Sequence, residues 1–173
     1  MVSIRLMLYP LRAMPSVECL IHRSEFVLLA RAEPAGPLAA IGGPVRAGES
    51  PLAACVRQVR EQTGLQVSPS CVAIVVEEIS DNPTDYHLTF VAECPDPRWQ
   101  PGDGLEWVPY GEIPRRPGIS DLDRQLLPEL LSSGAPVTVL IDIDASTQPP
   151  RRSLKGIMPI DPARLSPLVF AVR

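Results

Sequence analysis

The segment from Gly43 to Leu65 constrains the fold of this chain most, because it joins a loop to a helix with clear boundaries. Ser50 can accept hydrogen bonds from the free N–H groups at a helix start, and Pro51 suits the first helical position, where an N–H has no intrahelical partner. Gly64 offers the left-handed residue that commonly ends a helix. The sequence therefore predicts a loop that leads directly into a helix between Ser50 and Gly64.

This predicted helix has one apolar face and one polar face. Apolar residues recur at helical spacing, and we expect this group to be buried: Leu52, Cys55, Val56 and Val59. Residues three and four positions apart are neighbours on a helix, so a second group projects together from the opposite side. That polar group consists of Arg57, Gln58, Glu61 and Gln62.

The same segment resembles the Nudix box, a motif with the pattern G-x5-E-x7-R-E-U-x-E-E-x-G-U, where U is an aliphatic residue. In register, the matching residues are Gly43, Glu49, Arg57, Val59, Glu61, Gly64 and Leu65. Two positions where the motif has glutamate carry glutamine instead, namely Gln58 and Gln62. The resemblance covers roughly residues 17–131 and implies an α/β fold, a Nudix-like α/β/α sandwich with a mixed, curved sheet.

The resemblance also implies a chemistry. In Nudix enzymes, water cleaves diphosphate-linked substrates while Mg²⁺ or Mn²⁺ offsets the developing negative charge. Magnesium prefers oxygen ligands, and the motif supplies them as carboxylates on one side of the helix. Here Glu61 is the one carboxylate among the three positions 58, 61 and 62. A glutamine is neutral and cannot act as a base, and each lost charge at ~4 Å costs on the order of 4 kcal/mol at an effective dielectric constant of about 20.

Other residues can complete or replace this site. The resemblance makes Glu49 and Arg57 an ion pair that orients the loop, either in support of catalysis or as a purely structural contact. If the protein is active, we expect Glu61 to hold Mg²⁺ or Mn²⁺ together with Glu78 or Asp103. The alternative role of Glu78 and Asp103 is that of ordinary charged residues in contact with solvent. Asp103 lies near the position where related enzymes place an additional metal ligand on a loop. If the protein is inactive, we expect no cofactor.

Two further groups of polar residues are candidates for a ligand site. The basic segment 151–155 offers cations for a phosphate, although a solvated loop explains it more simply. His22 and His87 have no partner at a recognisable spacing, which favours satisfied or surface histidines.

Alternating apolar runs predict the remaining elements. A second helix is expected at Asp121–Leu131 with Ser120 as its cap. We expect strands at residues 3–9, 17–22, 26–31, 71–79, 86–94, 106–109, 137–144 and 168–172, with loops at 80–85 and 149–152. Residues 1–134 are predicted to form the Nudix-like domain. Residues 135–173 are predicted to form a C-terminal extension that packs on the same domain or on a dimer partner.

Composition excludes several classes of partner. The net charge of −4 gives no electrostatic footprint for nucleic acid or an anionic membrane. The four cysteines form no C-x-x-C pair, which argues against zinc and a redox pair and favours reduced thiols. No signal peptide or membrane-length apolar run is found. We therefore expect a cytoplasmic protein with a small nucleotide-like ligand and a possible homodimeric state.

Two functions remain open from the sequence. The first is a non-catalytic or weakly active binder of nucleotide-diphosphate-type ligands with a degenerate metal site. The second is an active Nudix hydrolase that cleaves a nucleoside diphosphate derivative. Gln58 and Gln62 favour the first function, and the retained Glu49, Arg57 and Glu61 favour the second.

Overall fold

A computed structural model describes residues 15–31, 33–161 and 169 of the chain. The helices are α1 (Pro51–Thr63) and α2 (Asp121–Ser132), and a 3₁₀ helix, η1 (Tyr110–Arg115), precedes α2. The strands are β1 (Ser16–Arg23), β2 (Phe26–Arg31), β3 (Leu38–Ala39), β4 (Ile41–Pro44), β5 (Ser70–Ile79), β6 (Asn82–Glu93), β7 (Leu105–Pro109), β8 (Val137–Asp144) and β9 (Arg151–Pro159).

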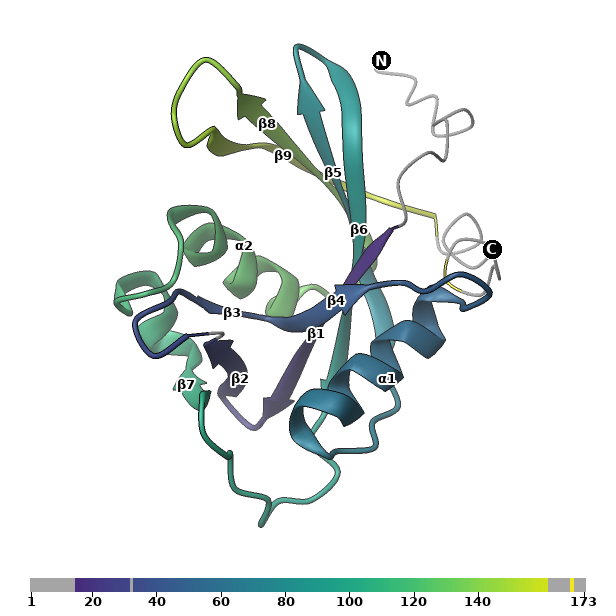
Figure 1. Ribbon diagram of the computed structural model, residues 1–173, viewed down its shortest axis with the longest axis vertical. Helices are drawn as coiled ribbons and strands as arrows, with labels where there is room; N and C mark the ends of the chain where they lie inside the picture. Colours follow the sequence, from purple (N-terminus) through teal and green to yellow (C-terminus); the bar gives the residue numbers. More distant parts are fainter. Residues whose placement is uncertain (1–14, 32, 162–168, 170–173) are drawn as a thin grey trace.

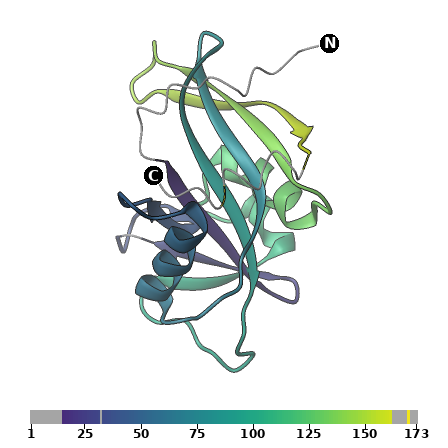
Figure 2. The same cartoon turned by 90° about the vertical axis from the view of Figure 1, so that its right-hand side faces the viewer.

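These strands form one mixed sheet that lies between the two helices. The strand order is β3-β2-β1-β6-β5-β8-β9, while β4 pairs with β1 and β7 pairs with β2. The pairs β1–β6 and β5–β8 are parallel, and the other pairs are antiparallel. Helix α1 covers one face and α2 the other (Figure 1), as the view turned by 90° also shows (Figure 2). The predicted α/β/α sandwich with a mixed sheet is confirmed.

Strand β1 connects the centre of the sheet to the loop before α1. One of its edges pairs with β6 over residues 16–22. Its other edge is divided, because residues 16–19 pair with β4 and residues 21–23 pair with β2. Since β4 leads directly into the loop before α1, the start of that loop is fixed to the middle of the sheet.

Each face of the sheet has its own apolar core. Strand alternation sends Cys19 and Ile21 toward α1 and Leu20 toward α2. The largest fully buried side chains of the α1 core are Ile21, Leu28, Ile41, Val59, Leu88 and Phe90. Those of the α2 core are Leu20, Val27, Leu29, Leu38, Ile113 and Ile141. With a core on both faces, the sheet fixes the position of α1 and therefore of the box.

The boundaries of α1 agree with the sequence prediction. The Ser50 hydroxyl oxygen accepts a hydrogen bond from the Ala53 N–H, and Pro51 opens the helix. Gly64 ends it in a left-handed conformation, with φ of 75°, and its N–H donates to the Arg60 carbonyl.

One face of α1 differs from the prediction. Gln58 is buried, with 8% of its surface exposed, and does not lie on a solvated polar face. Leu52 and Val56, which were expected in the core, are half-buried. The reason is a close approach of the helix to β4, where Gly43 leaves room for the Gln58 side chain. The helix therefore turns position 58 toward the loop and away from solvent.

Two predicted loops are wrong. The connection between β5 and β6 is a two-residue turn in which Ser80 and Asp81 both have left-handed φ values, of 51° and 63°. Such turns match the twist of a hairpin, so β6 begins at Asn82 and not near residue 86. Arg151 and Arg152 begin strand β9, because they pair with the end of β8.

The ends of the chain lie largely beyond this description. The strand predicted at residues 3–9 lies outside the described residues, as does the one at 168–172 apart from Val169, which is buried. Strand β8 pairs with β5, so the segment from residue 137 extends the same sheet. A dimer interface in this segment stays a prediction. No described helix is long and apolar enough to cross a membrane.

Replacing Gly64 by alanine should lower the free energy of unfolding by about 1 kcal/mol, because an L side chain is strained at a left-handed position. A Cβ there meets no atom within 4 Å, so the effect comes from the backbone alone. Gly102→Ala is the matched control, since that Cβ is equally unhindered and the residue is not left-handed. Urea denaturation measures both variants, and equal effects would contradict this role of Gly64.

Candidate functional site

Two glycines at the end of β4 permit close contact between strand, loop and helix. A Cβ on Gly42 would lie 2.1 Å from the Val17 carbonyl oxygen, so no larger residue fits against β1. A Cβ on Gly43 would lie 2.3 Å from the Gln58 amide nitrogen. Gly43 also has a φ of 159°, a value that residues with a side chain rarely adopt, so both the backbone and the space favour glycine at this position of the box. This close approach brings the carbonyls of Gly42 and Pro44 within reach of the helix side chains.

Glu49 and Arg57 form the ion pair that the resemblance implies. Arg57 donates through Nε to Glu49 Oε1 and through Nη2 to Glu49 Oε2, both at 2.8 Å. Arg57 Nη2 also donates to the Pro44 carbonyl at 3.0 Å. The hydrogen bonds from Arg57 lower the pKa of Glu49 to about 2. This bidentate contact fastens the loop to α1.

Two arginines lie against the Glu61 carboxylate, which is 47% exposed. Its Oε2 accepts from Arg57 Nη1 at 3.2 Å, and its Oε1 accepts from Arg46 Nη2 at 3.4 Å. Each carboxylate oxygen therefore faces a guanidinium group. The one carboxylate that the sequence keeps at helix positions 58, 61 and 62 is already compensated by the protein itself.

Gln58 and Gln62 direct their amides at the loop. Gln62 Nε2 donates to the Gly42 carbonyl at 2.8 Å and to Gln58 Oε1 at 3.1 Å. Gln58 Nε2 donates to the Pro44 carbonyl at 3.4 Å. In the flipped orientation of Gln58, its nitrogen reaches the Gly42 carbonyl at 3.3 Å and its oxygen accepts from Arg57. In both orientations an NH₂ group faces a loop carbonyl.

These contacts do not fit the divalent ion that the resemblance implies. Carboxylates at positions 58 and 62 would face carbonyl oxygens and would need a cation between the two groups. Amide NH₂ groups donate to those carbonyls directly, and so no cation is required to join them. Over residues 15–31, 33–161 and 169, no three His, Cys, Asp or Glu side chains are placed to hold a metal ion.

Glu78 lies with the basic residues of β9 and has no contact with Glu61 among the described residues. Its carboxylate accepts from Lys155 Nζ at 2.8 Å and is buried. Its neighbour Glu77 pairs with Arg152 at 3.3 Å. Glu77 and Glu78 of β5 therefore pair with Arg152 and Lys155, two of the cations that made segment 151–155 a candidate for phosphate binding.

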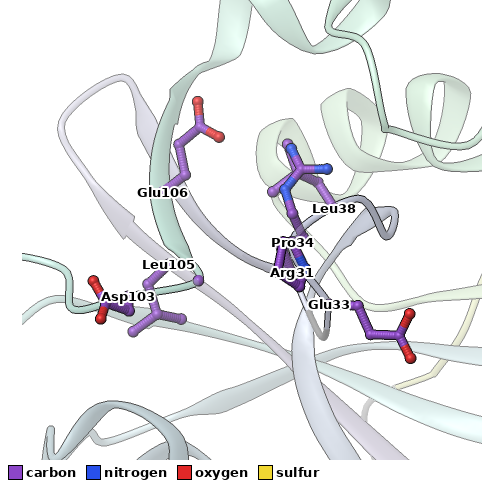
Figure 3. Close-up of a pocket in the computed structure, with 8 residues that line it drawn as sticks. Arg31, Glu33, Pro34, Leu38, Asp103, Leu105 and Glu106 are labelled. Carbon is purple, nitrogen blue, oxygen red and sulfur yellow. The ribbon is translucent and has the colours of Figure 1, made fainter.

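Asp103 lines a pocket of about 620 Å³, a volume typical of small-molecule sites. The pocket residues are Arg31, Glu33, Pro34, Leu38, Asp103, Gly104, Leu105 and Glu106. Figure 3 shows the carboxylates of Glu33, Asp103 and Glu106 pointing in different directions. Glu106 forms an ion pair with Arg116, and Arg31 donates to the Gly36 carbonyl. The pocket has room for a ligand, but its acids do not converge.

Sequence reasoning missed a polar network on the α2 face of the sheet. Glu18 Oε1 accepts from the Thr89 hydroxyl at 2.6 Å and lies 3.3 Å from His87 Nε2. Burial raises the pKa of Glu18, but hydrogen bonds from His87 and Thr89 outweigh it, and the pKa lies below its usual value. His87 thus has a partner. The signal that could have revealed Glu18 is its position as a charged residue within the apolar run VECLI.

Comparisons with known proteins identify the family. A family model described as the NUDIX domain matches residues 12–130, and the chain therefore belongs to the Nudix family. A solved mutator MutT protein from Bacillus halodurans is similar over 84% of this chain and 96% of that one, with 20% identity and a TM-score of 0.65. A NUDIX-family hydrolase from Clostridium perfringens is similar over 70% and 97%, with 19% identity and a TM-score of 0.57. These likenesses show the fold. No curated protein sequence matches the chain.

Replacing Gln62 by glutamate should lower the free energy of unfolding by about 1 kcal/mol without metal, because a donor becomes a charged acceptor facing the Gly42 carbonyl. Gln66→Glu is the matched control, since it adds the same charge to an exposed residue just beyond α1. Urea unfolding in EDTA compares the two variants. Equal losses of stability would contradict a specific amide–carbonyl contact.

Proposed function

We propose that this protein is a non-catalytic, or at most weakly active, Nudix module that binds a small ligand of the nucleotide-diphosphate type. The observation that carries the proposal is the hydrogen bond from the Gln62 amide to the Gly42 carbonyl, beside which the Gln58 NH₂ group faces a loop carbonyl in either orientation. These amides occupy the helix positions from which the motif presents carboxylates to a cation. The loop and the helix are thus joined by the protein alone.

Two requirements of phosphoanhydride hydrolysis are poorly served by these residues. A water nucleophile needs a base or a metal that lowers its pKa, and an amide supplies neither the proton acceptor nor the charge. The transition state also gains negative charge, which bound cations stabilise in metal-dependent sites. Glu61 is engaged with Arg46 and Arg57, and a carboxylate held in this way is a weak candidate for either task.

Ligand binding is supported by what the chain retains. The Glu49–Arg57 ion pair holds the loop against α1 without any glutamate at positions 58 and 62. The pocket beside Asp103 is of a size that accommodates a small molecule. Membership of the Nudix family favours a ligand with a diphosphate group. The protein keeps a scaffold suited to recognition while the groups for chemistry are replaced.

An active hydrolase is the second candidate function. The retained positions Glu49, Arg57 and Glu61 favour it, since all three match the box. It requires a metal ion held by Glu61 with Glu78 or Asp103. Glu78 is paired with Lys155, so that ion pair would have to open before Glu78 could hold a metal ion.

Activity assays separate the two candidates. We expect the wild-type protein to release no more product from ADP-ribose, nucleotide sugars or nucleoside triphosphates with Mg²⁺ than the Glu61→Gln variant does. The reason is that two of three anionic ligands are missing from the helix. Mg²⁺-dependent turnover of at least about 1 s⁻¹ that disappears in Glu61→Gln would overturn the proposed function.

A double restoration tests whether charge alone is missing. Gln58→Glu with Gln62→Glu recreates the motif, and we expect it to bind Mg²⁺ at least about tenfold more tightly than the wild type, a change of about 1.4 kcal/mol. Gln58→Glu with Gln66→Glu carries the same added charge without restoring position 62 and serves as the control. Calorimetric titration gives the affinities, and equal affinities would contradict the role assigned to Gln62.

A further inference from the structure

We propose that the box binds the phosphate groups of its ligand directly through Arg46, without an intervening metal ion. This inference rests on the proposed function and adds the residue and the chemistry of recognition. The ligand class is a di- or polyphosphate anion. In a box that lacks two carboxylates, an arginine beside Glu61 can supply the positive charge that a cation supplies elsewhere.

Arg46 is the arginine on the loop before α1, and most of its donors are open. Its side chain is 63% exposed, and its contact among the described residues is a single long one, from Nη2 to Glu61 at 3.4 Å. Arg57 is 17% exposed and uses Nε, Nη1 and Nη2 on Glu49, Glu61 and Pro44. A guanidinium carries five N–H donors, so most of those on Arg46 remain open to a ligand.

The backbone of Arg46 is held in place while its side chain is exposed. Its N–H donates to Glu49 Oε2 at 3.0 Å, and its carbonyl accepts from the Glu49 N–H at 3.1 Å. Glu49 is itself fixed by Arg57. The loop therefore presents the Arg46 side chain from a defined position, which lowers the entropy cost of binding an anion.

The charge balance of the box favours an anion. Between residues 43 and 65, Arg46, Arg57 and Arg60 oppose two carboxylates, those of Glu49 and Glu61, so the segment is net positive. Glutamates at positions 58 and 62 would make it net negative, and a phosphate would then need a cation to bind. The two substitutions thus remove the repulsion that a metal ion otherwise has to overcome.

The contacts of Glu61 allow Arg46 to exchange partners. Arg57 holds the other oxygen of Glu61 at 3.2 Å, so the carboxylate stays paired when Arg46 moves. Arg46 gives up a long, half-exposed contact and gains a phosphate, whose oxygens match the planar guanidinium fork. Both contacts are charge-assisted, but a phosphate can accept two N–H bonds from the fork, whereas Glu61 accepts one long bond from Arg46.

Calorimetric titration with inorganic pyrophosphate in EDTA tests the inference on the full chain. We expect binding without metal, a dissociation constant at least about tenfold weaker for Arg46→Gln, and an intermediate value for Arg46→Lys, which keeps the charge but loses the fork. Arg115→Gln, an exposed arginine of η1, is the matched control and should bind like the wild type. Affinity should fall as salt is raised.

Three results would overturn the inference: no pyrophosphate binding under any condition, pyrophosphate binding only when Mg²⁺ is added, or an Arg46→Gln variant that binds pyrophosphate as tightly as the wild type. Equal thermal stability of the variants confirms that each is folded. The proposed function fails separately, through Mg²⁺-dependent turnover that Glu61→Gln abolishes. Pyrophosphate binding in EDTA that is unchanged by Arg46→Gln would contradict this inference and leave the proposed function standing.

Discussion

The hydrogen bond from the Gln62 amide to the Gly42 carbonyl joins the helix of the box to strand β4 without a metal ion. It spans 2.8 Å from the last turn of α1 to the strand that pairs with the centre of the sheet. A carbonyl oxygen can be satisfied by a cation or by an N–H donor, and the choice decides whether the neighbouring helix needs carboxylates. With a donor in this place, the loop and the helix fit together without an ion.

The other contacts of the box are consistent with this substitution. The Glu49–Arg57 pair keeps the loop in position, and the two arginines at Glu61 balance the last carboxylate. A loop–helix unit built in this way is joined without a metal ion, and its formal charge between residues 43 and 65 is net positive. Under the proposed function, the geometry of the loop–helix unit is retained without the charges that hydrolysis uses.

The sequence predicts the parts of the structure that depend on local contacts. The cap at Ser50, the stop at Gly64 and the Glu49–Arg57 pair all lie within one short segment, and the box motif specifies their spacing. The sequence does not predict contacts that depend on tertiary packing. Gln58 is buried because α1 packs closely against β4. Glu18 accepts a hydrogen bond from Thr89, which lies 71 residues further along the chain.

The same distinction explains the errors in the strands. The left-handed φ values of Ser80 and Asp81 are imposed by the twist of the hairpin. The local sequence therefore did not predict a two-residue turn here. Arg151 and Arg152 look like a solvated loop until β8 provides a partner strand. The sequence made Glu78 a candidate metal ligand, but in the structure its carboxylate forms an ion pair with Lys155 of β9. In each case pairing with another strand outweighed local composition.

The central claim is that amide donors leave this box with no tight site for a doubly charged ion. Electron paramagnetic resonance of free Mn²⁺ during titration with the wild-type protein measures this most directly. The account predicts a signal that the protein does not reduce, which corresponds to a dissociation constant weaker than about 1 mM. A stoichiometric loss of signal at micromolar protein, reversed in Glu61→Gln, would contradict the account.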